Sequence, residues 1–170
     1  MTGCARTGYH TASGFSPAVL APAGVLAGER GLDWPVEGKV AAVFGDRAGD
    51  LPLKGIRIDP LPDAGIVASA GGRAVFVHPD FGGYGKTVIL EHAGGAATVY
   101  SGNFEILVSL GQEVRRGEVI ARFGREGGNA RRFYFELREN GKAVDPLNHL
   151  KKRKKLSKSE SREQGFLNHV

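Results

Sequence analysis

Residues 132–138 carry two kinds of side chain in strict alternation, which is the period of a β-strand. One set is apolar and is expected to enter a core: Phe133, Phe135 and Leu137. The other set is polar and is expected to line a surface or groove: Arg132, Tyr134, Glu136 and Arg138. Arginine and tyrosine often anchor protein interfaces, and a guanidinium can hold a carboxylate through two hydrogen bonds. The polar face of this strand therefore offers residue types that suit a contact surface.

The histidines and the cysteine do not form a metal-ligand pattern. A catalytic zinc takes about three protein ligands with nitrogen, oxygen or sulfur lone pairs. His78, His92 and His149 lie in separate segments, and Cys4 has no second cysteine with which to form a disulfide. We interpret the three histidines as scattered surface or core residues. The sequence predicts neither a metal nor another cofactor.

The net charge of +5 is concentrated at one end of the chain. Residues 151–170 hold seven of the 23 Lys/Arg and two of the 18 Asp/Glu, so the first 150 residues hold 16 of each. A neutral domain is not expected to bind nucleic acid, and no stacking aromatics are interleaved with the basic run. We interpret the run at 151–155 as a solvated extension. The alternative is electrostatic contact with an anionic membrane surface or an anionic polymer.

Short apolar segments separated by glycine-bearing turns predict an all-β fold, an antiparallel β-sandwich of two sheets. Asn140-Gly141 predicts a tight hairpin turn. The expected strands are residues 40–44, 55–58, 66–68, 73–77, 87–92, 97–100, 119–123 and 132–138.

The chain divides into three segments by composition. Residues 1–33 are expected to form an irregular or disordered leader, 34–150 the folded domain, and 151–170 a basic disordered tail. The apolar stretch at 17–28 is interrupted by two prolines, which makes it a poor signal-peptide core. No apolar run is long enough to span a membrane.

Several motifs, taken in their order along the chain, resemble the LytM-type domain of peptidase family M23. The resemblance covers residues 34–150 and adds the family's duplicated-hybrid-motif sandwich to the expected fold. The matching segments are residues 34–40, 44–45, 54–58, 67–68, 71–75, 84–92, 98–100, 107–117, 135–138 and 140–146.

The resemblance also locates the family's zinc ligands and catalytic histidines, and each of these positions has changed. The His-x-Gly-x-Asp ligands fall on Leu53 and Arg57, and the histidines of His-x-His fall on Arg132 and Tyr134. A further catalytic histidine falls on Gly102. Leucine and arginine have no lone pair to donate, and one tyrosine does not make a zinc site. The resemblance therefore implies a peptidase-like domain that is not an enzyme.

Degenerate LytM proteins that activate cell-wall amidases are the nearest likeness. This likeness implies a non-enzymatic activator in the periplasm or cell envelope, acting during cell division, whose partner is an N-acetylmuramoyl-L-alanine amidase. The alternative is a peptidoglycan-binding module, and a less favoured one is an active zinc endopeptidase. The expected contact surface consists of Lys54, Arg57, Tyr100, Arg132 and Tyr134.

Overall fold

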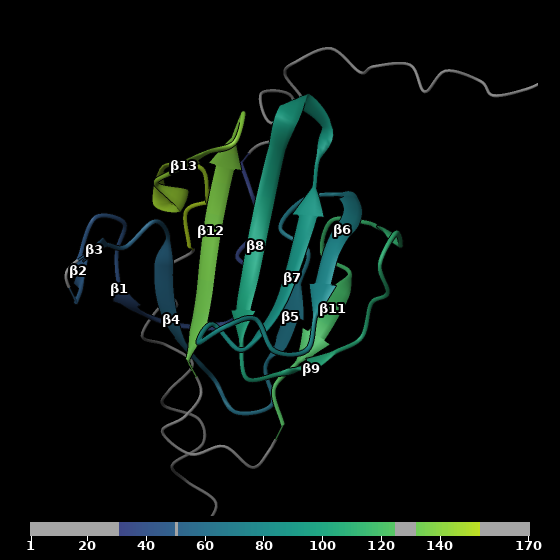
Figure 1. The fold of residues 1–170 in the computed structure, drawn as a ribbon, viewed down its shortest axis with the longest axis horizontal. Helices are drawn as coiled ribbons and strands as arrows, with labels where there is room; N and C mark the ends of the chain where they lie inside the picture. The colour runs from purple at the N-terminus through teal and green to yellow at the C-terminus, as the bar shows by residue number, and fades with distance from the viewer. Residues whose placement is uncertain (1–30, 50, 125–131, 154–170) are drawn as a thin grey trace, which may run out of the picture.

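The computed structural model describes residues 31–49, 51–124 and 132–153, and its regular structure is almost entirely β-strand (Figure 1). Within these described ranges, two single-turn 3-10 helices interrupt the strands, η1 (Ala93–Gly95) and η3 (Pro146–Asn148). No helix among the described residues is both long and apolar enough to cross a membrane. The strands are β1 (Gly38–Ala42), β2 (Arg47–Ala48), β3 (Leu51–Pro52), β4 (Ile56–Pro60), β5 (Gly65–Val67), β6 (Gly72–His78), β7 (Lys86–Glu91), β8 (Ala96–Gly102), β9 (Glu105–Ile106), β10 (Glu113–Val114), β11 (Val119–Arg122), β12 (Phe133–Glu139) and β13 (Lys142–Val144).

The strands form two main antiparallel sheets, as the sequence predicts. The eight-stranded sheet has the order β1-β4-β12-β8-β7-β6-β10, with β13 paired to the end of β12. The second sheet has the order β5-β11-β9, and β2 pairs with β3 in a separate hairpin. Figure 1 shows β12 and β8 side by side at the centre of the large sheet, and their pairing extends along all of β12.

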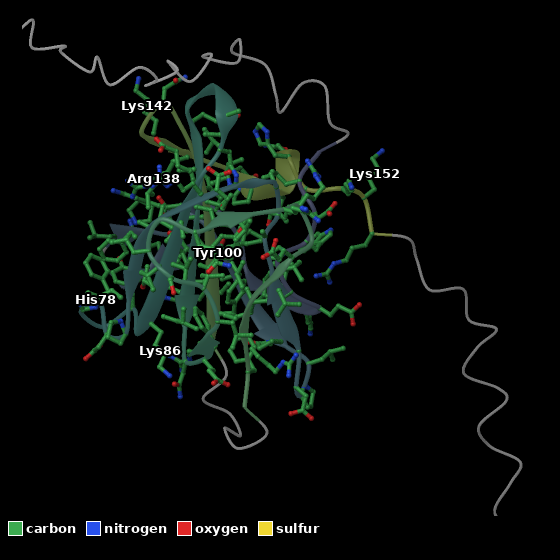
Figure 2. The ribbon with its side chains drawn as sticks, turned by 90° about the vertical axis from the view of Figure 1, so that its right-hand side faces the viewer. His78, Lys86, Tyr100, Arg138, Lys142 and Lys152 are labelled. Atoms are coloured by element: carbon green, nitrogen blue, oxygen red, sulfur yellow. The ribbon has the colours of Figure 1, made fainter. Side chains whose placement is uncertain are left out.

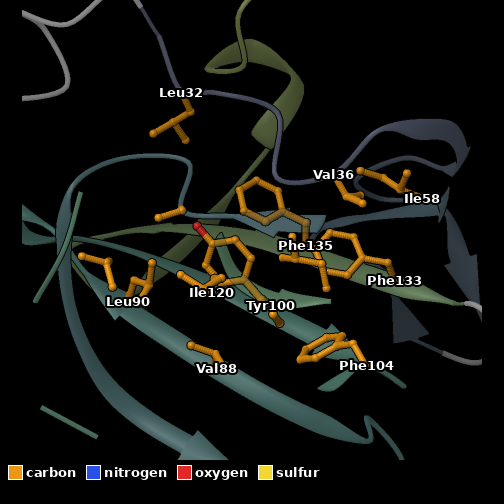
Figure 3. Close-up of a cluster of buried hydrophobic side chains, with 14 of the residues drawn as sticks. Leu32, Val36, Ile58, Val88, Leu90, Tyr100, Phe104, Ile120, Phe133 and Phe135 are labelled. Atoms are coloured by element: carbon orange, nitrogen blue, oxygen red, sulfur yellow. The ribbon is translucent and has the colours of Figure 1, made fainter. Parts of the chain in front are cut away.

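The hydrophobic core lies between the two sheets (Figure 3). Phe133 and Phe135 of β12 and Tyr100 of β8 are fully buried there, together with Ile66 of β5 and Ile120 of β11. Burying a side chain of this size contributes about 1.5–3 kcal/mol relative to leaving it in water. The predicted core face of β12 is confirmed.

Each predicted strand is present, with ends that differ by at most two residues. The predicted turn is also confirmed, because Asn140 (φ 50°) and Gly141 (φ 78°) both adopt the left-handed conformation between β12 and β13. The strands that the sequence does not predict are β2, β3, β9, β10 and β13, each of two or three residues. Pieces this short are held by their sheet neighbours and show too few residues for an alternating pattern.

The packed unit extends beyond the predicted limits of 34 and 150. Leu32 belongs to the core and forms a bridge with Leu150. The Trp34 indole N–H donates to the Lys151 carbonyl at 2.8 Å, and the Arg153 guanidinium lies 3.7 Å from the centroid of the Trp34 ring. The start of the basic run is therefore part of the domain. The disorder predicted for 1–30 and 154–170 falls outside the described residues.

A buried chain of polar groups ties the large sheet to the segment before β6. The two ring nitrogens of His92 lie 2.8 Å from the Gly71 carbonyl oxygen and 2.7 Å from the Thr98 hydroxyl. The Thr98 hydroxyl is 3.0 Å from the hydroxyl of Tyr100, which also accepts the Ser69 backbone N–H at 2.9 Å. Burial lowers the pKa of His92 below its ordinary value. His92 is thus a structural histidine with satisfied ring nitrogens.

Lowering the pH below about 6.5 is expected to reduce the free energy of unfolding, and His92→Gln should remove part of that dependence. The unfolded chain takes up a proton at the ordinary histidine value of 6.5, whereas the buried ring resists it. The stabilisation is therefore complete above that pH and is lost as the pH falls towards the lowered folded pKa. Urea unfolding between about pH 7.5 and 5 measures the slope. The exposed His78, changed to Gln, is the control, and identical slopes for His92→Gln and the wild type would contradict the prediction.

Candidate functional site

Strand β12 lies between β4 and β8 in the large sheet, and Tyr134 is on its outward face. In the register of the large sheet, Tyr134 lies opposite Arg57 of β4 and opposite Ser101 of β8. Arg57 is exposed, and so is Arg132, which immediately precedes β12. Lys54 is also exposed, just before β4 begins. The structure thus places Arg57 beside Tyr134, with Arg132 two residues away along the chain.

The prediction that Tyr100 belongs to this surface is wrong. Its side chain has 0% exposure and lies on the core face of β8, in contact with Phe133 and Phe135. Burial raises the pKa of its hydroxyl, which is hydrogen-bonded to the Ser69 backbone N–H and to the Thr98 hydroxyl. A side chain without exposed surface cannot touch a partner, so Tyr100 acts in packing.

The remaining two positions implied by the resemblance, Leu53 and Gly102, cannot supply a metal ligand or a catalytic group. Leu53 is buried and offers only carbon atoms. Gly102, at the end of β8, approaches the chain before β12 so closely that an added Cβ would lie 2.5 Å from the Arg132 carbonyl oxygen. A histidine would therefore not fit at residue 102 without movement of the backbone.

The residues present do not fit a zinc ion. Arg57 would place a cation next to the metal, Leu53 has no donor atom, and Tyr134 is a single weak ligand. Within residues 31–49, 51–124 and 132–153, no three His, Cys, Asp or Glu side chains are grouped so that they could hold a metal ion. We therefore derive no metal-dependent step at this site.

Glu136 is the unexpected residue of this face, because it is only 5% exposed on the side of the sheet that was predicted to be open. The Tyr134 hydroxyl donates to one of its carboxylate oxygens at 2.5 Å, and Arg138 Nε donates to the other at 2.5 Å. Burial and this hydrogen bond to Glu136 raise the pKa of Tyr134. Figure 2 shows where Arg138 lies on the molecule. The carboxylate therefore fixes the directions of Tyr134 and Arg138.

Tyr84 is a second residue that the sequence does not assign to this surface. It lies in the turn between β6 and β7, yet the centroid of its ring is 6.0 Å from that of Tyr134. The contact depends on how the turn folds over the sheet, which no local sequence pattern indicates. Alternation along β12 correctly assigns Glu136 to the outward face, but it does not indicate that this carboxylate is buried.

A family model and the relatives of similar sequence agree on one family for this chain. The model of peptidase family M23 matches residues 52–146. The chain is 39% identical over 120 residues to the murein hydrolase activator NlpD of Escherichia coli. This match covers 71% of this chain and 31% of NlpD. It is 38% identical over 115 residues to the murein hydrolase activator EnvC of the same organism, covering 66% of this chain and 27% of EnvC. The chain therefore spans about a third of the length of these relatives or less.

A solved structure supports the same fold. A zinc-containing peptidase from Vibrio cholerae superimposes with a TM-score of 0.57 at 25% identity, over 70% of this chain and 40% of the peptidase. The predicted LytM-type fold is confirmed by these likenesses.

Tyr134→Phe is expected to lower the free energy of unfolding by about 1–3 kcal/mol, because a buried carboxylate loses one of its hydrogen-bond donors. Urea unfolding at neutral pH measures the change. Tyr84→Phe removes the same hydroxyl from a ring that is 59% exposed and should have little effect. Equal stabilities for Tyr134→Phe and the wild type would show that the contact to Glu136 contributes nothing.

Proposed function

Because this chain belongs to peptidase family M23, and because its zinc-ligand positions offer at most one weak donor, Tyr134, we propose that it is a non-enzymatic activator of a cell-wall amidase. The observation that carries the proposal is the exchange at Arg57 and Tyr134, where two neighbouring strands present an exposed cation and an aromatic ring in place of ligands. Two relatives are named murein hydrolase activators, which supports this role.

The chemistry of the surface suits an acidic segment of the partner. Arg57, Arg132 and Lys54 are exposed cations, whereas the first 150 residues as a whole carry equal numbers of basic and acidic residues. The exposed guanidinium of Arg57 beside Tyr134, with Arg132 two residues away along the chain, can attract a carboxylate and orient it. Tyr134 adds an aromatic anchor that Glu136 already holds in position, so little side-chain entropy is lost on binding.

The proposed partner is an N-acetylmuramoyl-L-alanine amidase, and binding would promote peptidoglycan hydrolysis during cell division. An activator of murein hydrolysis acts in the cell envelope, and the periplasm is the compartment we propose. Contact of the run 151–155 with an anionic membrane stays a prediction, because residues 154 and 155 lie outside the described part of the chain.

Arg57→Glu and Arg132→Glu are each expected to lower amidase activation by at least about tenfold, because a reversed charge repels the acidic partner segment. The release of dye from labelled sacculi by purified amidase measures activation. Arg122→Glu is the matched control, since Arg122 is an exposed arginine on β11 of the other sheet. Normal activation by both Arg57→Glu and Arg132→Glu, with their folds intact, would exclude this surface as the contact site.

A peptidoglycan-binding module is the second candidate, and the same exposed arginines favour it. Arg57 and Arg132 could each hold a carboxylate of a wall peptide through paired hydrogen bonds. Sedimentation of the protein with purified sacculi in the absence of amidase distinguishes the two functions. Strong binding that Arg57→Glu abolishes, without activation by the wild type, would favour the wall-binding module.

The protein purified without added metal is expected to contain far less than one zinc per chain, because Leu53 and Arg57 cannot act as ligands. Elemental analysis measures the content, and a chelator should not change the effect of the protein on labelled sacculi. Stoichiometric zinc, together with wall lysis that the chelator inhibits, would instead identify a zinc endopeptidase.

A further inference from the structure

A row of aromatic rings continues from Tyr134 across the outward face of the large sheet. The ring centroids of Tyr134 and Tyr84 are 6.0 Å apart, those of Tyr84 and Phe81 6.3 Å, and those of Phe81 and Phe76 5.2 Å. His78 stacks on Phe76 with centroids 5.8 Å apart and an interplanar angle of 13°. We refer to these five residues as the aromatic row.

The row runs across the strands and ends at Arg57. In the register of the sheet, His78 lies opposite Thr87, Thr87 opposite Ser101, and Ser101 opposite Tyr134. Tyr134 in turn lies opposite Arg57. This line of paired residues therefore crosses β6, β7, β8, β12 and β4. It begins at the His78 ring on β6 and ends at the Arg57 guanidinium on β4.

The rings are both held in place and open to solvent. The Phe81 N–H donates to the Gly85 carbonyl at 2.8 Å, and the Tyr84 N–H donates to the Phe81 carbonyl at 3.0 Å, which closes the turn. At the end of this turn, Gly85 lies against Gly102 of β8 so closely that an added Cβ would be 2.9 Å from its carbonyl oxygen. Phe81 nevertheless remains 49% exposed and Tyr84 59% exposed.

A buried pair of polar groups lies between His78 and Tyr134 in the register of the sheet. Thr87 and Ser101 point to the outward face, where their hydroxyls are 3.0 Å apart, and both are almost fully buried. His78 and Tyr134 flank this pair in the register. A fixed, partly exposed aromatic surface above a satisfied polar pair is suited to contact with a second molecule, because its rings need little reordering.

We propose, resting on the activator function above, that the aromatic row is the apolar half of the same contact surface. Its occupant is an acidic and apolar polypeptide segment of the hydrolase that lies across the strands. A carboxylate of this segment meets Arg57, and its apolar side chains cover Phe81 and Tyr84. The charge of Arg57 selects the carboxylate, and exposed aromatic rings beside it supply the anchors that protein interfaces use.

The position of the row on the molecule disfavours a membrane as the occupant. In Figure 2, His78 lies at one side of the domain and Lys152, in the basic run, at the other. Lys152 of the basic run therefore does not adjoin the His78 end of the aromatic row. The cation next to the row is Arg57, which suits a protein carboxylate.

The test compares the double variant Phe81→Ser/Tyr84→Ser with Arg57→Glu, using the purified amidase that the wild-type protein activates as the probe. The dissociation constant is measured at about 0.05 M and about 0.5 M salt. The double variant is expected to bind at least about tenfold more weakly at both concentrations and to keep the salt dependence of the wild type. Arg57→Glu is expected to lose most of that salt dependence.

Leu107→Ser is the matched control, because Leu107 is 46% exposed and lies beside β11 of the other sheet, where its N–H donates to Ile120. It removes a similar apolar surface and should bind like the wild type. The single variant Tyr84→Ser, which changes one exposed ring, provides the same comparison if the double variant does not fold.

The outcomes separate the two proposals. If the wild type and Arg57→Glu differ in binding while the double variant and Tyr84→Ser equal the wild type, the aromatic row is not part of the surface and the activator function stands. If the wild type neither binds nor activates amidases, both proposals fail. If the double variant loses binding to purified sacculi but keeps amidase binding, the row is a glycan site and the polypeptide inference is overturned.

Discussion

The candidate surface and the hydrophobic core share strand β12, and the two-residue period of a β-strand keeps them apart. Phe133, Phe135 and Leu137 are fully buried between the sheets, whereas Tyr134 lies on the outward face beside Arg57. A residue on the outward face can therefore change without leaving a cavity in the core. This separation explains how a chain with replaced zinc-ligand positions keeps the fold of a zinc-containing peptidase.

Glu136 is the exception to this simple division, and it gives the outward face its rigidity. A carboxylate that is 5% exposed is stabilised only when its oxygens have partners, and Tyr134 and Arg138 each donate to one of them. The same hydrogen bonds restrict the side-chain rotamers of both donors. Tyr134, which belongs to the proposed contact surface, is thus ordered before a partner binds, which lowers the entropy cost of association.

The sequence predicts the parts of this molecule that depend on local pattern, and it fails where distant segments meet. Alternation along 132–138 was sufficient to assign the core face. It could not assign Tyr100, because residues on both faces of β8 are buried and their polarity does not distinguish the faces. The contact of Tyr84 with Tyr134 joins residues 50 positions apart through a turn that folds over the sheet. Neither composition nor spacing carries that information.

Exposed cations alone cannot account for a specific complex at this surface. An ion pair between solvent-exposed groups contributes about 0–1 kcal/mol, and salt weakens it further. A dissociation constant of about 1 μM requires about 8 kcal/mol. Arg57 and Arg132 can orient an acidic segment and speed its approach, but most of the affinity has to come from apolar area removed from water. The exposed rings of Phe81 and Tyr84 supply such area on the same face of the sheet, so the arginines and the aromatic row are most effective when one partner segment covers both.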